Sequence, residues 1–116
     1  MNTYKTGIFS EWYARMFLRM HGYKILQSRY ITGRHTGRAE IDIIAARHDT
    51  IVFVEVKNRP DLMSAWAAIT PGQQIRLRRA AETYLIKHRW TGGARFDVIA
   101  VCGLKIYWAK NAKTSK

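Results

Sequence analysis

The stretch that decides the fold is Glu40-Ile-Asp-Ile-Ile-Ala-Ala-Arg-His-Asp-Thr-Ile-Val-Phe-Val-Glu-Val-Lys57. Two runs rich in β-branched and apolar residues, 41–46 and 51–56, flank a polar tetrapeptide. Such runs around a short polar segment are typical of two strands joined by a tight turn. We therefore expect a β-hairpin whose loop consists of His48 and Asp49.

A two-residue loop sets the register of this hairpin. Asp42 then lies opposite Glu55, and Glu40 lies opposite Lys57. Because side chains alternate along a strand, these four charged residues share one face. The other face has no polar atom and can only be core: Ile41, Ile43, Ala45, Val52, Val54 and Val56.

The two carboxylates at the charged end of the hairpin need a compensating cation, because otherwise one of them is pushed to keep its proton. Paired Cβ atoms lie roughly 5 Å apart, and like charges placed there destabilise a sheet. Lys57 supplies one positive charge, and a divalent metal would supply the rest. Magnesium binds through one or two protein carboxylates and keeps most of its waters, which fits this cluster. The alternative is a surface salt-bridge ladder, in which Glu40 pairs with Lys57 and Asp42 with an arginine.

Length and charge narrow the class of protein. The 116 residues predict one domain, residues 1–116, and the formal charge of +12 favours a polyanionic partner. Nucleic acid fits best, an anionic membrane surface less well, and a generally basic protein is the simplest alternative. Cys102 is the only cysteine, which excludes an intramolecular disulfide and zinc clusters. No apolar segment approaches membrane-spanning length and no signal peptide is recognisable, so we expect a cytoplasmic protein.

The segments before the hairpin predict a helix and a strand. Residues 7–21 are helical in pattern, and Gly22 is suited to end that helix. The apolar stripe expected to pack on the sheet comprises Ile8, Phe9, Trp12, Tyr13, Met16, Phe17 and Met20. Glu11 lies off this stripe, beside Ala14 and Leu18. A strand over 23–30 precedes a glycine-rich loop whose Arg34, His35 and Arg38 suit phosphate contacts, although a plain solvated loop explains them equally well.

The segments after the hairpin predict a crossover. Residues 58–69 read as a loop, and Thr70-Pro-Gly-Gln73 predicts a capped helix start. In that helix, Gln74 faces the strand ends, whereas Arg76 and Arg79 belong to a basic outer surface. A strand over 95–101 should lie parallel to the second hairpin strand, with a short edge strand over 104–108. The basic tail over 109–116 is expected to fray.

The predicted element order is α-β-β-β-α-β-β, with Asp42 on one strand and Glu55-Val-Lys57 on the next. This arrangement resembles the restriction-endonuclease-like PD-(D/E)xK nuclease fold. That fold is α/β, with a central mixed β-sheet flanked by helices. Over about residues 6–102 the chain resembles the YraN-like family of small uncharacterised bacterial proteins. The matching positions are Gly7, Glu11, Ala14, Gly22-Tyr23, Glu40-Ile-Asp42, Phe53-Val-Glu-Val-Lys57 and Arg95-Phe-Asp97. The chain departs from the family pattern at Ser10, Ala39 and Gln73.

This family is similar to the archaeal Holliday junction resolvases, and the resemblance implies an activity and a site. The implied activity is that of a metal-dependent endonuclease that hydrolyses DNA, with structured or branched DNA among its candidate substrates. Such an enzyme would bind Mg²⁺ or Mn²⁺. By matching position, Asp42 and Glu55 would hold the metal, and the Val56 carbonyl and Glu11 would complete its shell. Lys57 would activate water or neutralise the phosphate. Gln74 and Glu40 would support the site.

Two other functions remain compatible with the sequence. One is a nucleic-acid-binding module on the same fold with an idle acidic cluster. The other is an interaction subunit whose basic surface meets an acidic protein. A homodimer is expected by analogy with the resolvases, although no stretch of the sequence identifies the interface.

Overall fold

The computed structural model describes residues 3–33 and 38–111, with side chains from residue 7 onward. Its elements, in chain order, are α1 (Thr3–Met20), β1 (Lys24–Thr32), β2 (Ala39–Arg47), β3 (Thr50–Asn58), α2 (Leu62–Ala67), α3 (Pro71–Lys87), β4 (Gly93–Cys102) and β5 (Lys105–Ala109). This confirms the α/β class and the predicted order, with the short helix α2 added. No helix in the described part is long and apolar enough to cross a membrane.

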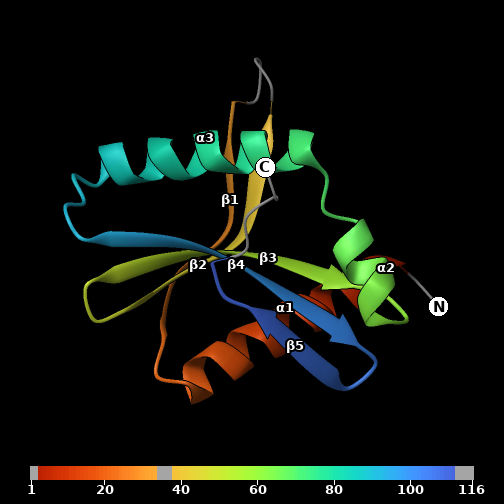
Figure 1. The fold of residues 1–116 in the computed structure, drawn as a ribbon. Helices are drawn as coiled ribbons and strands as arrows, with labels where there is room; N and C mark the ends of the chain where they lie inside the picture. Colours follow the sequence, from red (N-terminus) through yellow and green to blue (C-terminus); the bar gives the residue numbers. More distant parts are fainter. Residues whose placement is uncertain (1–2, 34–37, 112–116) are drawn as a thin grey trace.

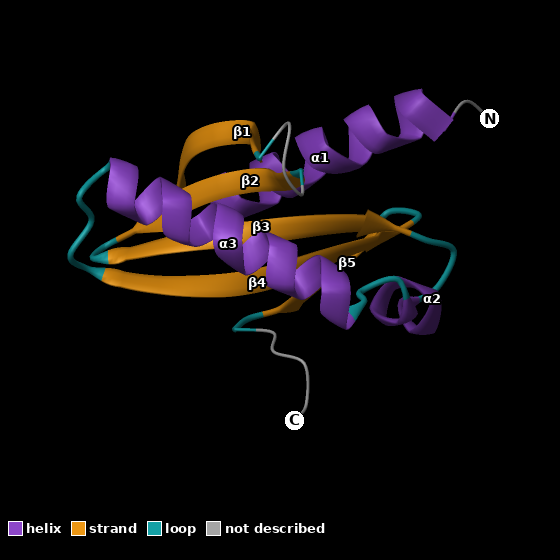
Figure 2. Cartoon of the chain, turned by 90° about the horizontal axis from the view of Figure 1, so that it is seen from above, coloured by secondary structure: helices purple, strands orange, loops and turns teal. Residues whose placement is uncertain are grey.

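The five strands form one mixed sheet in the order β1-β2-β3-β4-β5. Only β3 and β4 pair in parallel, and the segment that joins them contains α2 and α3. The predicted crossover and the parallel pair are therefore confirmed. Helix α3 covers one face of the sheet and α1 covers the other, as the two perpendicular views show (Figures 1 and 2).

Each face of the sheet has its own hydrophobic core. On the α3 side, Phe53 and Ile44 pack with Leu77, Ala80 and Tyr84. On the α1 side, Ala14 and Leu18 pack on residues from three strands: Ile43, Ala45, Val52, Val54, Ile99 and Val101. The near-continuous apolar runs of β3 and β4 follow from this arrangement, because both faces of a central strand are covered.

The hairpin has the predicted register over only part of its length. Arg47 faces Thr50 across the two-residue loop, and the ladder continues to the pair of Ile43 and Val54. It ends there, so the predicted pairs of Asp42 with Glu55 and of Glu40 with Lys57 are not ladder pairs. β2 stays paired with β1 as far as Ala39, while β3 stays paired with β4 as far as Asn58. The sheet therefore splits between β2 and β3 where the carboxylates begin, which relieves the like-charge contact that continued pairing would impose.

The predicted all-apolar face of the hairpin also changes sides at this split. Ile43 belongs to the core beneath α1, whereas Ile41 belongs to the core beneath α3. In a regular strand, Ile41 and Ile43 are two residues apart and would point to the same face of the sheet. Because they point to opposite faces, the regular alternation of side chains in β2 is interrupted at Asp42. All six predicted core residues are at least partly buried, but they do not form a single layer.

Helix α1 turns a different face to the sheet than the apolar stripe predicts. Its buried residues are Ser10, Ala14 and Leu18, spaced four apart. Two small residues in this row allow the helix to lie close to the sheet. Of the predicted core stripe, only Tyr13 and Phe17 pack against the core, and the other members are exposed: Ile8, Phe9, Trp12, Met16 and Met20. The prediction of that stripe as core was therefore wrong for these five residues and is confirmed for Tyr13 and Phe17.

Local capping agrees with the sequence at most element ends. Gly22 has φ +86°, and the amides of Gly22 and Tyr23 donate to carbonyls in the last turn of α1, as the predicted cap requires. The segment predicted as a loop instead contains α2, because Asp61 accepts a hydrogen bond from the Ser64 amide at 2.8 Å and caps a short helix. The end of the basic tail, residues 112–116, lies outside the described residues.

Asp97 in β4 is fully buried, and we expect it to hold β4 and β5 together. It accepts two hydrogen bonds from Arg95, at 2.8 and 2.7 Å, and others from the Trp108 indole and the Asn111 amide, both at 2.8 Å. Asp97→Asn keeps the size but loses the charged pair, and hydrogen bonds to charged groups contribute about 2 kcal/mol each. The free energy of unfolding, measured by urea denaturation, should fall by about that amount. An unchanged urea midpoint would contradict this role.

Candidate active site

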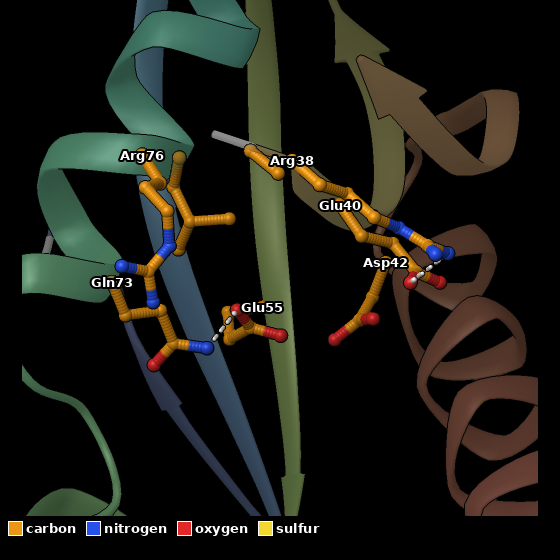
Figure 3. A pocket seen from close by; sticks show the side chains of 8 residues that line it. Arg38, Glu40, Asp42, Glu55, Gln73 and Arg76 are labelled. Atoms are coloured by element: carbon orange, nitrogen blue, oxygen red, sulfur yellow. Dashed lines mark hydrogen bonds and ion pairs between the residues drawn. The ribbon is translucent and has the colours of Figure 1, made fainter. Parts of the chain in front are cut away.

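The split between β2 and β3 opens a cavity of about 360 Å³. Its lining comes from β2 and the residue before it, from β3, and from the first turns of α3: Arg38, Ala39, Glu40, Asp42, Glu55, Gln73, Arg76 and Leu77. Figure 3 shows the carboxylates of Asp42 and Glu55 directed into this space from neighbouring strands, with Gln73 and Arg76 on the α3 side. The two acids that the hairpin pattern singled out therefore meet, across an opening rather than across a ladder.

Asp42 replaces a backbone acceptor at the point where the ladder ends. Its Oδ2 accepts a hydrogen bond from the Val56 amide at 2.8 Å. In a continued hairpin a carbonyl of β2 would take that amide proton. The side chain thus fixes the separation of the two strands. The resemblance assigns the Val56 carbonyl, which belongs to the following peptide, to a metal shell, but Val56 is not among the residues that line the cavity.

Glu55 is a buried acid of the cavity, and its pKa is strongly raised. It is 7% exposed and accepts a hydrogen bond from Gln73 Nε2 at 3.0 Å. Burial, followed by hydrogen bonding to Asp42 and repulsion from it, raises the pKa of Glu55 from 4.5 to about 9. The charge of Lys57 acts in the opposite direction. Without a cation, the buried carboxyl therefore keeps its proton at neutral pH.

The glutamine that donates a hydrogen bond to Glu55 is Gln73, whereas the sequence singled out Gln74 as the glutamine that supports the site. Thr70 accepts the Gln73 amide proton at 3.1 Å and caps α3, as predicted. The Gln73 side chain does not complete a capping box and instead reaches Glu55. Gln73 lines the cavity and Gln74 does not. The sequence pattern explained Gln73 as part of a capping box, and so it gave no reason to expect a hydrogen bond from Gln73 to Glu55.

Glu11 approaches the cavity from α1 and pairs with Arg29 of β1. The distances are 3.1 Å from Arg29 Nε to Oε1 and 3.4 Å from the second nitrogen to Oε2, and the Glu11 side chain is 15% exposed. Burial is the main cause that raises the pKa of Glu11, and repulsion from Asp42 adds to it, while Arg29 lowers it. Glu11 thus belongs to the same electrostatic cluster as Asp42.

Arg29 is a site residue that sequence reasoning missed. It has φ +55° inside a strand, a conformation that is rare for residues other than glycine, asparagine and aspartate. Ser28 and Tyr30 on either side of it pair with β2 in one register, and the register shift that β1 contains lies earlier, between Ile25 and Gln27. No pattern in the sequence distinguishes this arginine from the other exposed basic residues.

Lys57 lies near the end of β3 and is not among the residues that line the cavity. The next residue, Asn58, donates a hydrogen bond from its side-chain amide to the hydroxyl of buried Ser10 in α1. Helix α1 is therefore tied to β3 through Ser10 and to β1 through Glu11, on both sides of the split. The half-buried Lys57 lies close enough to Glu55 to lower the pKa of that acid.

The predicted phosphate-binding residues divide into three groups. Arg38 and Arg76 line the cavity, and Arg38 lies 3.9 Å from Glu40. Glu40 is thus at the cavity wall beside an arginine, which fits its supporting role. Arg79 is exposed on α3 and does not line the cavity. Arg34 and His35 lie outside the described residues.

The donors fit a hard divalent cation. Asp42 and Glu55 direct carboxylate oxygens into one space, and neither acid has an ion-pair partner within 4.0 Å among residues 7–33 and 38–111. In the same part of the chain, no group of three or more acids, histidines or cysteines is close enough to hold a metal. Two protein carboxylates with waters are a common magnesium shell. Glu11 is engaged by Arg29 and would have to leave it to join that shell.

Comparison with known proteins places residues 10–101 within the sequence model described as "Uncharacterised protein family UPF0102". A UPF0102 protein of Paramagnetospirillum magneticum is 38% identical over 84% of this chain and 77% of its own length. One of Mesorhizobium japonicum is 41% identical over 84% and 77%. One of Chlorobium phaeobacteroides is 42% identical over 82% and 74%.

Proposed function

The chain belongs to the uncharacterised family UPF0102, the YraN-like proteins, and from the chemistry of its cavity we propose that it is a metal-dependent nuclease acting on DNA. The observation that carries this proposal is the convergence of Asp42 and Glu55 at the split in the sheet. The pKa of Glu55 is raised by burial and by Asp42, and a bound cation would oppose this shift because it favours the ionised carboxylate.

Each residue of the site would have a distinct part in hydrolysis. Asp42 and Glu55 would hold Mg²⁺ or Mn²⁺, which when bound supplies charge neutralisation at the phosphate and lowers the pKa of water. Gln73 orients the Glu55 carboxyl. The Lys57 ammonium would face the scissile phosphate and stabilise the charge that develops there.

The arginines at the cavity wall give the substrate a place to bind. Arg38 and Arg76 border the carboxylates on two sides, and guanidinium groups recognise phosphate through two parallel hydrogen bonds. A phosphodiester between them would lie against Asp42 and Glu55. The overall charge of +12 would attract a polyanion to this surface.

A cleavage assay on purified protein tests the proposal. Single-stranded, duplex, flapped and four-way-junction DNA would each be incubated with magnesium, manganese or chelator. Glu55→Ala serves as the control for contaminating nucleases. We expect cuts that require metal and vanish in Glu55→Ala. Equal cutting by wild type and Glu55→Ala, or no cutting on any substrate, would overturn the proposal.

One observation favours a second candidate, a nucleic-acid-binding module with an idle site. Glu11 is paired with Arg29, and the described residues hold no three-acid cluster ready for metal. Such a module would bind DNA equally well with chelator and with magnesium, and would cut none. The same assay, combined with a binding measurement, separates the two functions.

Arg76→Ala tests the phosphate contact independently of catalysis. Loss of one phosphate contact should weaken binding to every DNA by a similar factor and reduce the slope of log affinity against log salt by about 1. Fluorescence anisotropy in chelator at several salt concentrations measures both quantities. Lys87→Ala is the matched control, because it removes one charge about 16 Å further along α3. A salt slope equal to that of wild type would contradict the contact.

A further inference from the structure

The exposed face of α1 is an apolar surface that the proposed cleavage chemistry does not use. We call it the α1 stripe: Ile8, Phe9, Trp12, Met16 and Met20. Trp12 is 48% exposed and Phe9 41%. Their ring centroids lie 6.1 Å apart at 35°, and Phe9 also stacks on Tyr13 at 5.5 Å. Contiguous exposed apolar surface of this kind marks a binding site more often than a solvated helix face.

Cations accompany the α1 stripe along the helix. Arg15 follows Trp12 by three residues, and Arg19 follows Met16 by three, a spacing that makes each pair neighbours on a helix surface. Arg19 reaches the Met16 sulfur at 3.7 Å. Glu11 is the only acid in α1. The stripe therefore combines accessible aromatic rings with positive charge.

Glu11 connects the α1 stripe with the proposed active site, although no residue of α1 is among those that line the cavity. Glu11, Arg15 and Arg19 are spaced four apart and form a row beside the stripe, and Glu11 is the residue of α1 that belongs to the acidic cluster. Figure 2 shows the N-terminal half of α1 projecting past β1 and β2. A chain leaving the cavity along Glu11 would thus pass the two arginines with its backbone and the aromatic rings with its bases.

We propose that the α1 stripe is a stacking platform for unpaired bases, with Trp12 and Phe9 as its rings and Arg15 and Arg19 as its phosphate contacts. This inference rests on the proposed function and assigns the substrate class: nucleic acid with a single-stranded segment next to the cut. Aromatic rings beside a basic track hold single strands without sequence preference. Bases in a continuous duplex are already stacked on one another and present no free face.

Charge favours a polyanion over a second copy of the chain on this stripe. Two copies would bring chains of +12 together, with Arg15 and Arg19 of each beside the shared surface. Like charges at an interface oppose association, whereas the same arginines complement phosphates. A self-associated α1 face is therefore the competing outcome of the test.

Trp12→Leu is the decisive variant, because leucine keeps an apolar side chain and removes the ring. Binding to fluorescein-labelled 20-nucleotide oligo-dT and to a 20-base-pair duplex would be measured in chelator. We expect Trp12→Leu to weaken oligo-dT binding about tenfold and to leave duplex binding within about twofold. Trp12→Phe should retain most of the oligo-dT affinity. Ile86→Ala, which trims an exposed apolar residue of α3, should change neither.

Three results would overturn the platform. They are unchanged oligo-dT binding by both Trp12→Leu and Phe9→Leu, an equal loss on both probes, and sedimentation as a dimer that Trp12→Leu dissociates. Because binding is read in chelator, it is independent of cleavage. A Trp12-dependent preference for oligo-dT without any cleavage by wild type would refute the nuclease and keep the platform. Cleavage by wild type, together with oligo-dT binding that Trp12→Leu leaves unchanged, would support the nuclease and refute the platform.

Discussion

Asp42→Asn is expected to lower the rate of magnesium-dependent DNA cleavage roughly 1,000-fold, because charge stabilisation by a bound metal supplies several kcal/mol to such reactions. Asparagine still offers an oxygen to the Val56 amide, the contact that Asp42 makes at 2.8 Å. The strands should therefore stay apart in the same way, and only the negative charge is removed. Cleavage rates with saturating DNA, measured across a range of magnesium concentrations, give the effect.

Two controls make this result specific. Asp61→Asn applies the same chemical change to an exposed acid that caps α2, and it should leave cleavage unchanged. Asp42→Asn should also bind DNA in chelator with an affinity and salt slope close to those of wild type. If Asp42→Asn cut DNA as fast as wild type, the assignment of the acidic site would be wrong even if the protein proved to be a nuclease.

Glu55→Gln is expected to make the metal-free protein more stable at pH 8 by roughly 5 kcal/mol, since pH 8 lies about 3.5 units above the ordinary carboxyl pKa of 4.5 and one unit corresponds to about 1.4 kcal/mol. The pKa of Glu55 is raised to about 9 in the folded protein, chiefly by burial. The folded state therefore holds a proton that the unfolded state releases, and stability is lost as the pH rises from about 4.5 toward 9. Glutamine remains neutral and can still accept the Gln73 hydrogen bond.

Urea denaturation at pH 5 and pH 8 in chelator measures this difference. The two proteins should be similarly stable at pH 5 and diverge at pH 8. Added magnesium should then stabilise wild type, by about 2.7 kcal/mol at 100 times the dissociation constant, and Glu55→Gln much less. Parallel loss of stability in both proteins between pH 5 and pH 8 would show that Glu55 is not the group responsible. Equal stabilisation by magnesium would place the metal elsewhere.

Much of the fold could be predicted because its decisive signals are local. The apolar runs of β2 and β3 around His48 and Asp49 are consistent with one loop length, and the observed register follows that loop. Gly22 and Thr70 mark helix ends through contacts within a few residues of themselves. The same locality places Asp42 and Glu55 on neighbouring strands, so their meeting could be expected before any coordinates.

The face of α1 that packs on the sheet could not be predicted from local sequence signals. Apolar periodicity marks the side of a helix with the largest hydrophobic residues, and here that side is the α1 stripe. What decides the buried side is how closely the sheet can approach, and Ser10 and Ala14 allow a closer approach than Phe9 or Trp12. This preference depends on the shape of β3 and β4 beneath the helix, which the sequence of α1 does not contain.

The sequence by itself determined the order of the longer elements, the hairpin register from the loop to the pair of Ile43 and Val54, and the two carboxylates, because each depends on residues close together along the chain. Only the tertiary structure decided that β2 and β3 separate at Asp42 and that Gln73 reaches Glu55. It also decided that Arg29 is the partner of Glu11. These contacts join segments that lie far apart in the chain, and they depend on balancing buried charge in three dimensions, which no local pattern records.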